Sequence, residues 1–170
     1  MKRRNFFKTA ALGGGTLVLA PLSSCLQPET NAESSVNYAD FELNEWSISQ
    51  LQEQMSSGQM TSEGITRKYL DRIELVNNNG PELRAVIEIN PEAIKIAQEL
   101  DIERLVGKLR GPLHGIPVLI KDNIDTGDQM QTTAGSLAMV GSPAPDDAII
   151  IQRLREAGAV LLGKTNLSEW

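Results

Sequence analysis

The sequence predicts an α/β fold, in which short apolar strands alternate with amphipathic helices. Apolar residues recur at helical spacing in four segments, and runs rich in Val, Ile and Leu lie between them at residues 84–89, 117–121 and 160–162. Glycine, asparagine or proline marks most junctions. Alternation of strand, helix and strand is the pattern of a sheet with helices packed on its faces.

Two helices are expected before the first strand. The first begins at a capping box formed by Ser47 and Gln50 and ends near Gly58. Its expected inward-facing residues are Ile48, Leu51 and Met55. Thr61 caps the second helix, which ends at the turn 77–81. The expected buried stripe of this helix is Ile65, Tyr69, Ile73 and Val76.

Two more helices separate the three strands. Asn90 is an N-cap followed by a proline at the first helical position, and this helix is expected to run to about Val106. Its expected inward residues are Ile94, Ala97 and Leu105. The second strand, 117–121, is apolar on both faces, as buried parallel strands are. Asp146 is expected to cap the last helix, and Gly158 to end it before the third strand. The expected inward side of this helix is Ile150, Leu154 and Ala157.

The lysine that ends the second strand is the candidate catalytic residue. Lys121 closes an apolar run at the rim of a core, where desolvation disfavours a charged amine. A neutral amine in such a place can act as a general base. Sites in open α/β sheets form beyond the carboxyl ends of the strands, where Lys121 and Lys164 are both expected. Composition and spacing alone, however, favour a strand-end lysine that reaches to solvent.

Three motifs follow one another along the chain: LHGIPVLIKDNID at residues 113–125, TTAGS at 132–136 and GKTNLSEW at 163–170. Together they resemble the amidase signature family, the serine hydrolases of amide bonds. The resemblance extends over residues 43–170. It implies an amidase-like α/β/α fold with a mixed, largely buried sheet covered by helices, of which this chain supplies the N-terminal part. It also implies a triad of a neutral lysine, a bridging serine and a nucleophilic serine, and it places the lysine at Lys121.

Both serines of that family lie in a glycine- and serine-rich segment downstream of the Lys-Thr-Asn motif, and this sequence contains no such segment. The resemblance therefore implies an amidase acting on a small-molecule or peptide amide, of whose Ser–Ser–Lys triad only the lysine is present. We expect the 170-residue chain alone to be inactive. The alternative is a truncated, non-catalytic surface lipoprotein or binding module derived from an amidase. No cofactor or metal is implied.

The N-terminus resembles an export signal. Residues 1–24 combine KRRNFFK, similar to a twin-arginine motif, with an apolar stretch too short to span a bilayer. LSSC at 22–25 resembles a lipobox, so Cys25 is the expected lipidation site. An ordinary small residue near a cleavage site is the alternative interpretation. We expect a signal peptide at 1–24, a flexible tether at 25–42 and an exported, extracytoplasmic lipoprotein anchored to the membrane.

Composition argues against several other classes of protein. The net charge is −6, and four cationic residues with no acidic ones precede Cys25, so the body of the chain is strongly acidic. Nucleic-acid binding needs a basic face and is therefore not expected. Cys25 is the only cysteine and His114 the only histidine, which argues against a disulfide, a cysteine-based zinc site and a histidine-pair metal site. The sequence does not predict an oligomeric state.

The remaining polar motifs have structural interpretations beside functional ones. Residues 158–165 fit the P-loop pattern, but its variable positions form a strand, so Lys164 is expected to support the site by hydrogen bonding or to be structural. His114 is expected to be a loop or packing residue, although a His–Ser dyad stays open. Turn and cap roles, with some hydrogen bonding to Lys121, are expected of Asp122, Asn123, Asp125 and Asp128. Two interpretations stay open for Thr132, Thr133 and Ser136: they line the acyl pocket, or they form a helix N-terminus.

Overall fold

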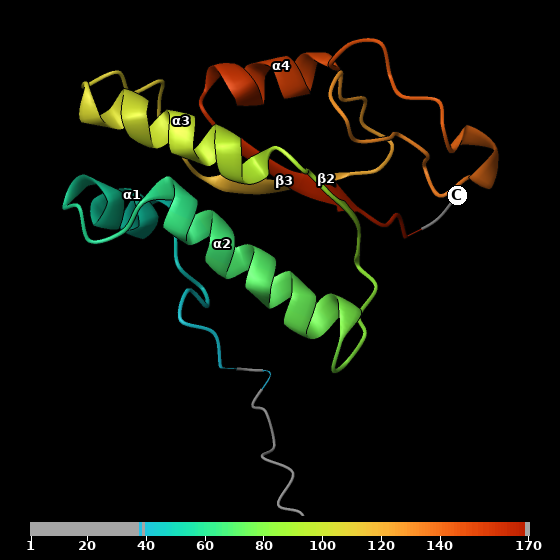
Figure 1. Ribbon diagram of the computed structural model, residues 1–170, viewed down its shortest axis with the longest axis horizontal. Coiled ribbons are helices and arrows are strands. Elements are labelled where there is room, and N and C mark those ends of the chain that lie inside the picture. The colour runs from blue at the N-terminus through green and yellow to red at the C-terminus, as the bar shows by residue number, and fades with distance from the viewer. Residues whose placement is uncertain (1–37, 39, 169–170) are drawn as a thin grey trace, which may run out of the picture. The chain divides into compact units, whose positions relative to one another are not determined.

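The computed structural model describes Tyr38 and residues 40–168 (Figure 1). The leader, Cys25 and most of the expected tether lie outside the described residues. The described elements, in chain order, are α1 (Ile48–Ser56), α2 (Ser62–Ile73), the π-helical turn η1 (Glu74–Asn78), β1 (Val86–Ile89), α3 (Ala93–Leu105), β2 (Pro117–Lys121), the 3-10 turn η2 (Leu137–Met139), α4 (Ile149–Glu156) and β3 (Val160–Thr165).

The three strands form a mixed sheet in the order β1-β3-β2. β3 is central: it pairs in parallel with β2 and antiparallel with β1. Residues 160–164 of β3 are all buried, as expected for a strand covered on both faces. The predicted α/β class with a mixed sheet is therefore confirmed.

Each face of the sheet has its own hydrophobic core. On one face α2 and α3 pack against β3, and on the other α4 and the loop after β2 pack against β2 and β3. The first core contains Ile73, Ala93, Ala97, Leu100, Val160 and Leu162. The second contains Ile120, Met130, Ile151 and Leu161. A third core lies between α1, α2, the residues before α1 and the residue before β2. It contains Leu43, Leu51, Met55, Ile65 and Ile116.

The predicted starts of the first two helices are confirmed. Ser47 and Gln50 form a complete capping box, and the hydroxyl of Thr61 accepts the backbone N–H of Gly64 at 2.9 Å. The residues before α1 also pack: the rings of Phe41 and Tyr69 meet edge to face with centroids 5.3 Å apart. The chain is thus held by side-chain contacts from Phe41 onward.

Several predicted helix faces are wrong in detail. The buried stripe of α3 includes Ala97 and Leu100, whereas Leu105, expected inside, is 86% exposed. Leu105 follows Leu100 by five residues, which turns its side chain about 140° away around the helix. Ile48, at the first position of α1, is also exposed.

The start of α4 differs from the prediction as well. The helix begins at Ile149, its N-cap is Ala148 and no side chain caps it, so the prediction that Asp146 is the cap is wrong. The neighbouring Asp147 accepts from the backbone N–H of Gly127 at 2.8 Å and from Arg155 Nε at 2.8 Å. Ile151, and not Ile150, lies in the core. None of the described helices is long and apolar enough to cross a bilayer.

Among the described residues, β1 and β2 are both outer strands with one unpaired edge, and each exposes an apolar side chain: Ile87 at 44% and Leu119 at 38%. Open strand edges with apolar side chains promote association.

We predict that the 170-residue chain binds a hydrophobic dye and self-associates as its concentration rises, and that Leu119→Thr reduces both. Leu109→Thr, at an exposed loop leucine, is the control. Equal effects of the two substitutions in dye titration and light scattering would contradict this prediction.

Candidate active site

Irregular strand pairing decides which face of the sheet Lys164 occupies. Val118 of β2 pairs with Leu161, but the next residue of β2 pairs with Gly163, so β3 contains one extra residue. An extra residue reverses the alternation of side chains beyond it. Leu161 belongs to the core under α4, and because of the extra residue Lys164 faces that same side. Without the bulge, these two positions would lie on opposite faces.

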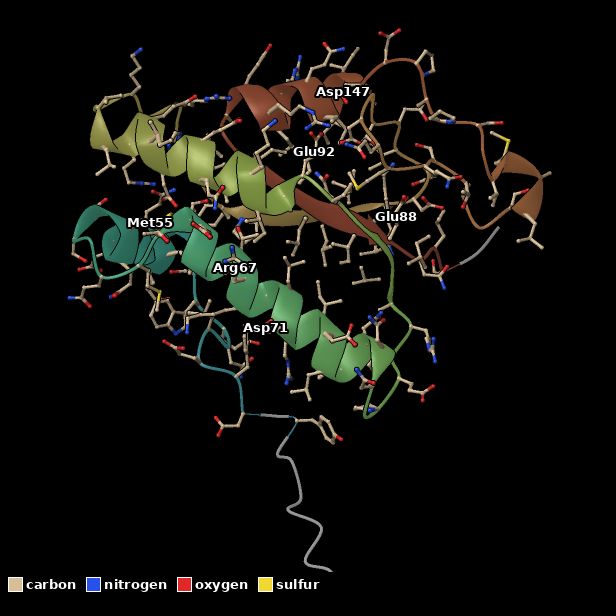
Figure 2. The ribbon with its side chains drawn as sticks, in the orientation of Figure 1. Met55, Arg67, Asp71, Glu88, Glu92 and Asp147 are labelled. Atoms are coloured by element: carbon tan, nitrogen blue, oxygen red, sulfur yellow. The ribbon has the colours of Figure 1, made fainter. Side chains whose placement is uncertain are left out.

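Gly163 makes this arrangement sterically allowed. A Cβ atom at this position would lie 2.3 Å from the carbonyl oxygen of Glu88 on β1. Any side chain would therefore push β1 away from β3. β1 is also irregular at this level, between Val86 and Glu88, and Glu88, labelled in Figure 2, comes into register with Lys164.

Lys164 is a fully buried lysine inside the central strand, with 0% of its surface exposed. The prediction that it lies beyond the strand end is wrong, since β3 continues to Thr165. Its Nζ donates to the carbonyl oxygen of Ile124 at 2.7 Å and to Thr132 Oγ1 at 3.0 Å. Both acceptors belong to the loop after β2, so the amine fixes this loop against the sheet. The expected supporting role through hydrogen bonds agrees with these contacts.

The charge of Lys164 is subject to opposing influences. Burial lowers the pKa of its amine below the ordinary 10.5, and the nearby carboxylates of Asp122, Asp128, Glu88 and Asp125 act in the opposite direction. No carboxylate of the described residues makes a salt bridge with Lys164. The amine therefore depends on two neutral acceptors inside the protein.

Asp122, directly after β2, is the second buried group that shapes the loop. Its side chain is 1% exposed, and its Oδ2 accepts from Thr133 Oγ1 at 2.5 Å, from the backbone N–H of Thr133 at 3.2 Å and from that of Gly135 at 3.4 Å. These contacts hold the TTAGS motif at the end of the sheet. Through these contacts and the bond to Lys164, Thr132 and Thr133 fix the loop. Ser136 stands at the N-terminus of the 3-10 turn η2 and makes no side-chain capping hydrogen bond there.

Lys121 ends β2, as predicted, and its side chain is exposed. Its Nζ donates to the carbonyl oxygen of Asn166, just beyond β3, at 2.8 Å. The desolvation expected for Lys121 at the rim of a core is therefore not found among the described residues, where β2 is an outer strand. The amine nevertheless lies at the carboxyl ends of the two parallel strands, where catalytic groups of α/β proteins gather.

The other polar residues of the loop serve the fold. Asp128 accepts from Arg155 Nη2 at 2.6 Å and from the backbone N–H of Met130 at 2.9 Å, which ties the loop to α4. Asp125 is exposed. The expected hydrogen bonding of this cluster to Lys121 is absent from the described contacts, since the lysine amine is bonded to Asn166. No group of three or more potential metal ligands occurs among the described residues.

His114 is a packing residue, in line with its structural interpretation. It is 1% exposed; its Nδ1 accepts the backbone N–H of Arg110 at 3.3 Å, and its Nε2 lies 2.9 Å from the carbonyl oxygen of Leu100. A carbonyl oxygen can only accept, so Nε2 is the donor to Leu100. Both ring nitrogens are thus occupied inside the fold.

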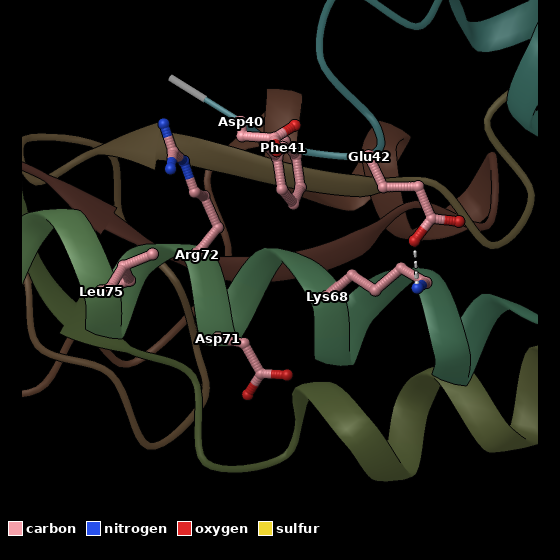
Figure 3. A pocket seen from close by; sticks show the side chains of 7 residues that line it. All are labelled: Asp40, Phe41, Glu42, Lys68, Asp71, Arg72 and Leu75. Carbon is pink, nitrogen blue, oxygen red and sulfur yellow. Dashed lines mark hydrogen bonds and ion pairs between the residues drawn. The ribbon is translucent and has the colours of Figure 1, made fainter. Parts of the chain in front are cut away.

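Two of the surface cavities in the described part of the chain have charged residues of β1 or α2 in their lining. One, of about 320 Å³, opens beside the end of the sheet and is lined by Ile87, Glu88, Asp122, Gln131, Thr133 and Val140. The other, of about 240 Å³, lies along α2 (Figure 3). In it Lys68 pairs with Glu42, and the Arg72 guanidinium lies 5.5 Å from the centre of the Phe41 ring. Only the first cavity adjoins residues of the KDN and TTAGS motifs.

Comparison with known proteins identifies the family. The model of the family described as Amidase matches residues 64–170, well over half of the chain. The chain belongs to the amidase family. The match covers all three strands, Lys121 and the loop that Lys164 holds.

Curated relatives carry amidase or amidotransferase names. A putative amidase of Schizosaccharomyces pombe is 47% identical over 84% of this chain and 24% of its own length. A probable amidase of Arabidopsis thaliana is 41% identical over 90% of this chain and 30% of its own length. A glutamyl-tRNA(Gln) amidotransferase subunit from Renibacterium salmoninarum is 43% identical over 76% of this chain and 24% of its own length. The chain thus spans between about a quarter and a third of the length of these relatives.

Solved amidase structures share the fold. The native peptide amidase of Stenotrophomonas maltophilia is 55% identical, with a TM-score of 0.74 over 77% of this chain and 26% of that chain. An amidase family protein of Bacillus anthracis is 40% identical, with a TM-score of 0.72 over 76% of this chain and 25% of that chain. The amidase-like α/β arrangement expected from the sequence is therefore confirmed for this N-terminal portion.

Lys164→Met should destabilise the fold by about 2–4 kcal/mol, because it leaves the acceptors on Ile124 and Thr132 without a donor in the interior. Lys95→Met, at an exposed lysine of α3, should change stability by less than about 0.5 kcal/mol. Urea unfolding followed by circular dichroism measures both.

The loss of stability caused by Lys164→Met should depend on pH. Burial lowers the pKa of Lys164 in the folded state below 10.5, so between that lowered pKa and 10.5 the unfolded chain binds more protons. The stability contributed by Lys164 therefore rises with pH through this window and falls as pH drops. The difference in unfolding free energy between the native chain and Lys164→Met should grow toward pH 10.5. A difference that shrinks with rising pH would contradict the buried, poorly solvated amine.

Proposed function

We propose that this chain is the N-terminal part of an amidase that hydrolyses carboxamides and that Lys121 is its general base. The observation that carries the proposal is the place of Lys121: it stands in the KDN motif of an amidase-family chain, at the carboxyl end of β2, with its amine bonded beside the end of β3. In this position a strand fixes its backbone while its side chain remains accessible to a substrate.

The chemistry follows from a neutral amine next to two serines. Lys121 accepts a proton through the bridging serine as the nucleophilic serine attacks the carbonyl carbon. The C–N bond breaks, ammonia or an amine leaves with a proton, and an ester to the serine remains. Water then hydrolyses this acyl-enzyme, and the carboxylic acid is released. The two serines belong to the remainder of an amidase domain.

The exposure of Lys121 in this chain sets a requirement on that remainder. A general base needs a neutral amine, and burial away from water favours that form. Segments that pack over the open edge of β2 would desolvate the amine and favour its neutral form. For this reason we expect the 170-residue chain alone to release no ammonia from small amides.

The substrate we propose is a small-molecule or peptide amide. One of the most similar solved structures is a peptide amidase, which supports this class. Amidotransferase subunits also occur among the relatives, but an exported protein would not meet a cytosolic tRNA-linked substrate.

A hybrid enzyme tests the role of Lys121. In it, residues 43–168 of this chain replace the matching segment of the Stenotrophomonas maltophilia peptide amidase, to which the chain is 55% identical. Lys121→Ala should lower ammonia release from a peptide amide by about 10²–10⁴-fold. Lys121→Arg should be no better, since a guanidinium stays protonated.

Lys95→Ala, at an exposed lysine of α3, is the control and should keep full activity. Thermal unfolding should be nearly the same for all variants. Substantial activity of Lys121→Arg would mean that the site needs a fixed positive charge rather than a base, and would refute the proposed role.

We also propose that the protein is exported and anchored to the membrane through a lipid on Cys25. The twin arginines and the LSSC sequence support this proposal. Cells expressing the native sequence should incorporate radiolabelled palmitate, and Cys25→Ala should abolish the label. Replacing Arg3 and Arg4 by lysine should block export if the twin-arginine route is used. Equal labelling of the alanine variant would overturn the anchor.

A further inference from the structure

Helix α3 has apolar residues on two opposite faces. One face, which includes Ala97 and Leu100, packs in the core against β3. Ile102, Leu105 and Val106 lie about half a turn away around the helix axis, because each residue of a helix advances by about 100°. These three side chains are 61%, 86% and 63% exposed. The end of α3 therefore presents an apolar surface that no described residue covers.

The loop that follows α3 extends this surface and is held in one shape. Leu109, which is 57% exposed, belongs to this loop. The buried ring of His114 joins the loop to α3: it accepts the backbone N–H of Arg110 at 3.3 Å and donates to the carbonyl oxygen of Leu100 at 2.9 Å. Arg110 also pairs with Glu103 of α3. We call the four exposed residues, Ile102, Leu105, Val106 and Leu109, the α3-end patch.

Basic side chains surround the α3-end patch, although the protein as a whole is acidic. Residues 103–110 contain Arg104, Lys108 and Arg110 but a single acidic residue, Glu103, whereas the net charge of the chain is −6. Lys108 is exposed and takes part in none of the salt bridges of the described residues. Apolar side chains flanked by lysine and arginine are typical of a surface that lies in the interface of an anionic bilayer.

A second cluster of exposed apolar side chains has the opposite charge. It consists of Leu137, Met139, Val140, Ile149 and Ile150. Residues 122–152, which contain this cluster, include five aspartates and neither lysine nor arginine. An anionic bilayer repels such a surface and attracts a basic one. Of the two clusters, the α3-end patch is therefore the one whose charge suits a phospholipid surface.

The proposed lipid on Cys25 brings a bilayer within reach of the patch. Phe41, whose ring packs against Tyr69, follows Cys25 by 16 residues. A chain of this length spans at most about 55 Å when fully extended. A domain tethered so closely meets the bilayer at a high effective concentration, so a small patch is enough to orient it.

We propose that the α3-end patch lies in the headgroup region of an anionic phospholipid bilayer, with Lys108 on the lipid phosphates. This inference rests on the proposed function, in which Cys25 carries the anchor and Lys121 marks the active site. The loop after the patch leads into the amino end of β2, whereas Lys121 is at its carboxyl end. Figure 1 likewise shows α3 ending on the opposite side of the sheet from the end of β3. The bound domain therefore turns its proposed active site away from the bilayer, toward amides in solution.

Vesicle binding of the hybrid with the peptide amidase tests the patch. The hybrid lacks residues 1–42 of this chain, so neither the leader nor a lipid on Cys25 contributes. Leu105→Gln should weaken binding to vesicles of phosphatidylcholine and phosphatidylglycerol about tenfold, because it removes a large apolar side chain from the interface. Leu83→Gln, at a leucine that is 61% exposed in the turn before β1, is the matched control and should bind like the parent hybrid. Flotation of the vesicles measures the bound fraction.

A second pair of variants tests the charge of the lipid. Lys108→Gln should weaken binding to the same vesicles about fivefold, because one cation near an anionic surface contributes about that factor. Lys95→Gln, at an exposed lysine near the other end of α3, should change nothing. Vesicles of phosphatidylcholine alone should bind the parent hybrid more weakly. Equal binding to both kinds of vesicle would overturn the anionic bilayer as the occupant.

Readouts without lipid separate this inference from the proposed function. Hydrolysis of a soluble peptide amide and the thermal unfolding midpoint should be the same for all four variants. If the hybrid hydrolyses no amide, or if the native chain takes up no palmitate, the proposed activity or the proposed anchor fails, and the vesicle comparison still decides whether the patch binds lipid.

Four results would overturn the proposal. The first is a parent hybrid that binds no vesicles, and the second is an equal loss of binding for Leu105→Gln and Leu83→Gln. The third is a lower unfolding midpoint of Leu105→Gln alone, which would mean that the remainder of the amidase domain covers the patch. The fourth is a dimer in light scattering that Leu105→Gln dissociates, which would mean that a second copy covers it.

Discussion

The arrangement of this chain depends on a lysine amine buried at the centre of the sheet. Lys164 donates to Ile124 and Thr132 from inside β3, so the strand at the middle of the fold holds the loop that follows β2. Burying an amine without a carboxylate partner is costly, and only its hydrogen bonds offset that cost. The loop is therefore coupled to the sheet: it cannot leave without exposing the amine or leaving it without acceptors.

This coupling connects the packing of the protein to its proposed chemistry. The extra residue of β3 at Leu162 and the missing side chain of Gly163 bring Lys164 to the loop face. The loop then presents Asp122 next to Lys121, at the carboxyl ends of two parallel strands. The fold thus contains two lysines with different tasks: a buried one that builds the site and an accessible one that we propose acts as the base. Arg155 fixes the same loop to α4 from its other side.

The sequence predicted what depends on local pattern and missed what depends on strand registration. The caps at Ser47 and Thr61 and the strand that ends at Lys121 follow from residue types at fixed spacing, whereas the mixed sheet was expected from the resemblance to the amidase signature family. The burial of Lys164 could not be predicted in this way, because it follows from bulges set by how three distant strands pair. The only signal in the sequence for this burial is that Gly163 and Lys164 directly follow the apolar run 160–162.

A carbon-13 NMR titration of the lysine side chains tests whether a buried Lys164 amine holds the loop, with the Lys164 signal assigned through its absence in Lys164→Met. Since burial outweighs the surrounding carboxylates, we expect the pKa of Lys164 to lie below the ordinary 10.5, while exposed Lys95 provides the internal reference. A Lys164 signal that titrates together with Lys95, at or above 10.5, would contradict a buried amine holding the loop.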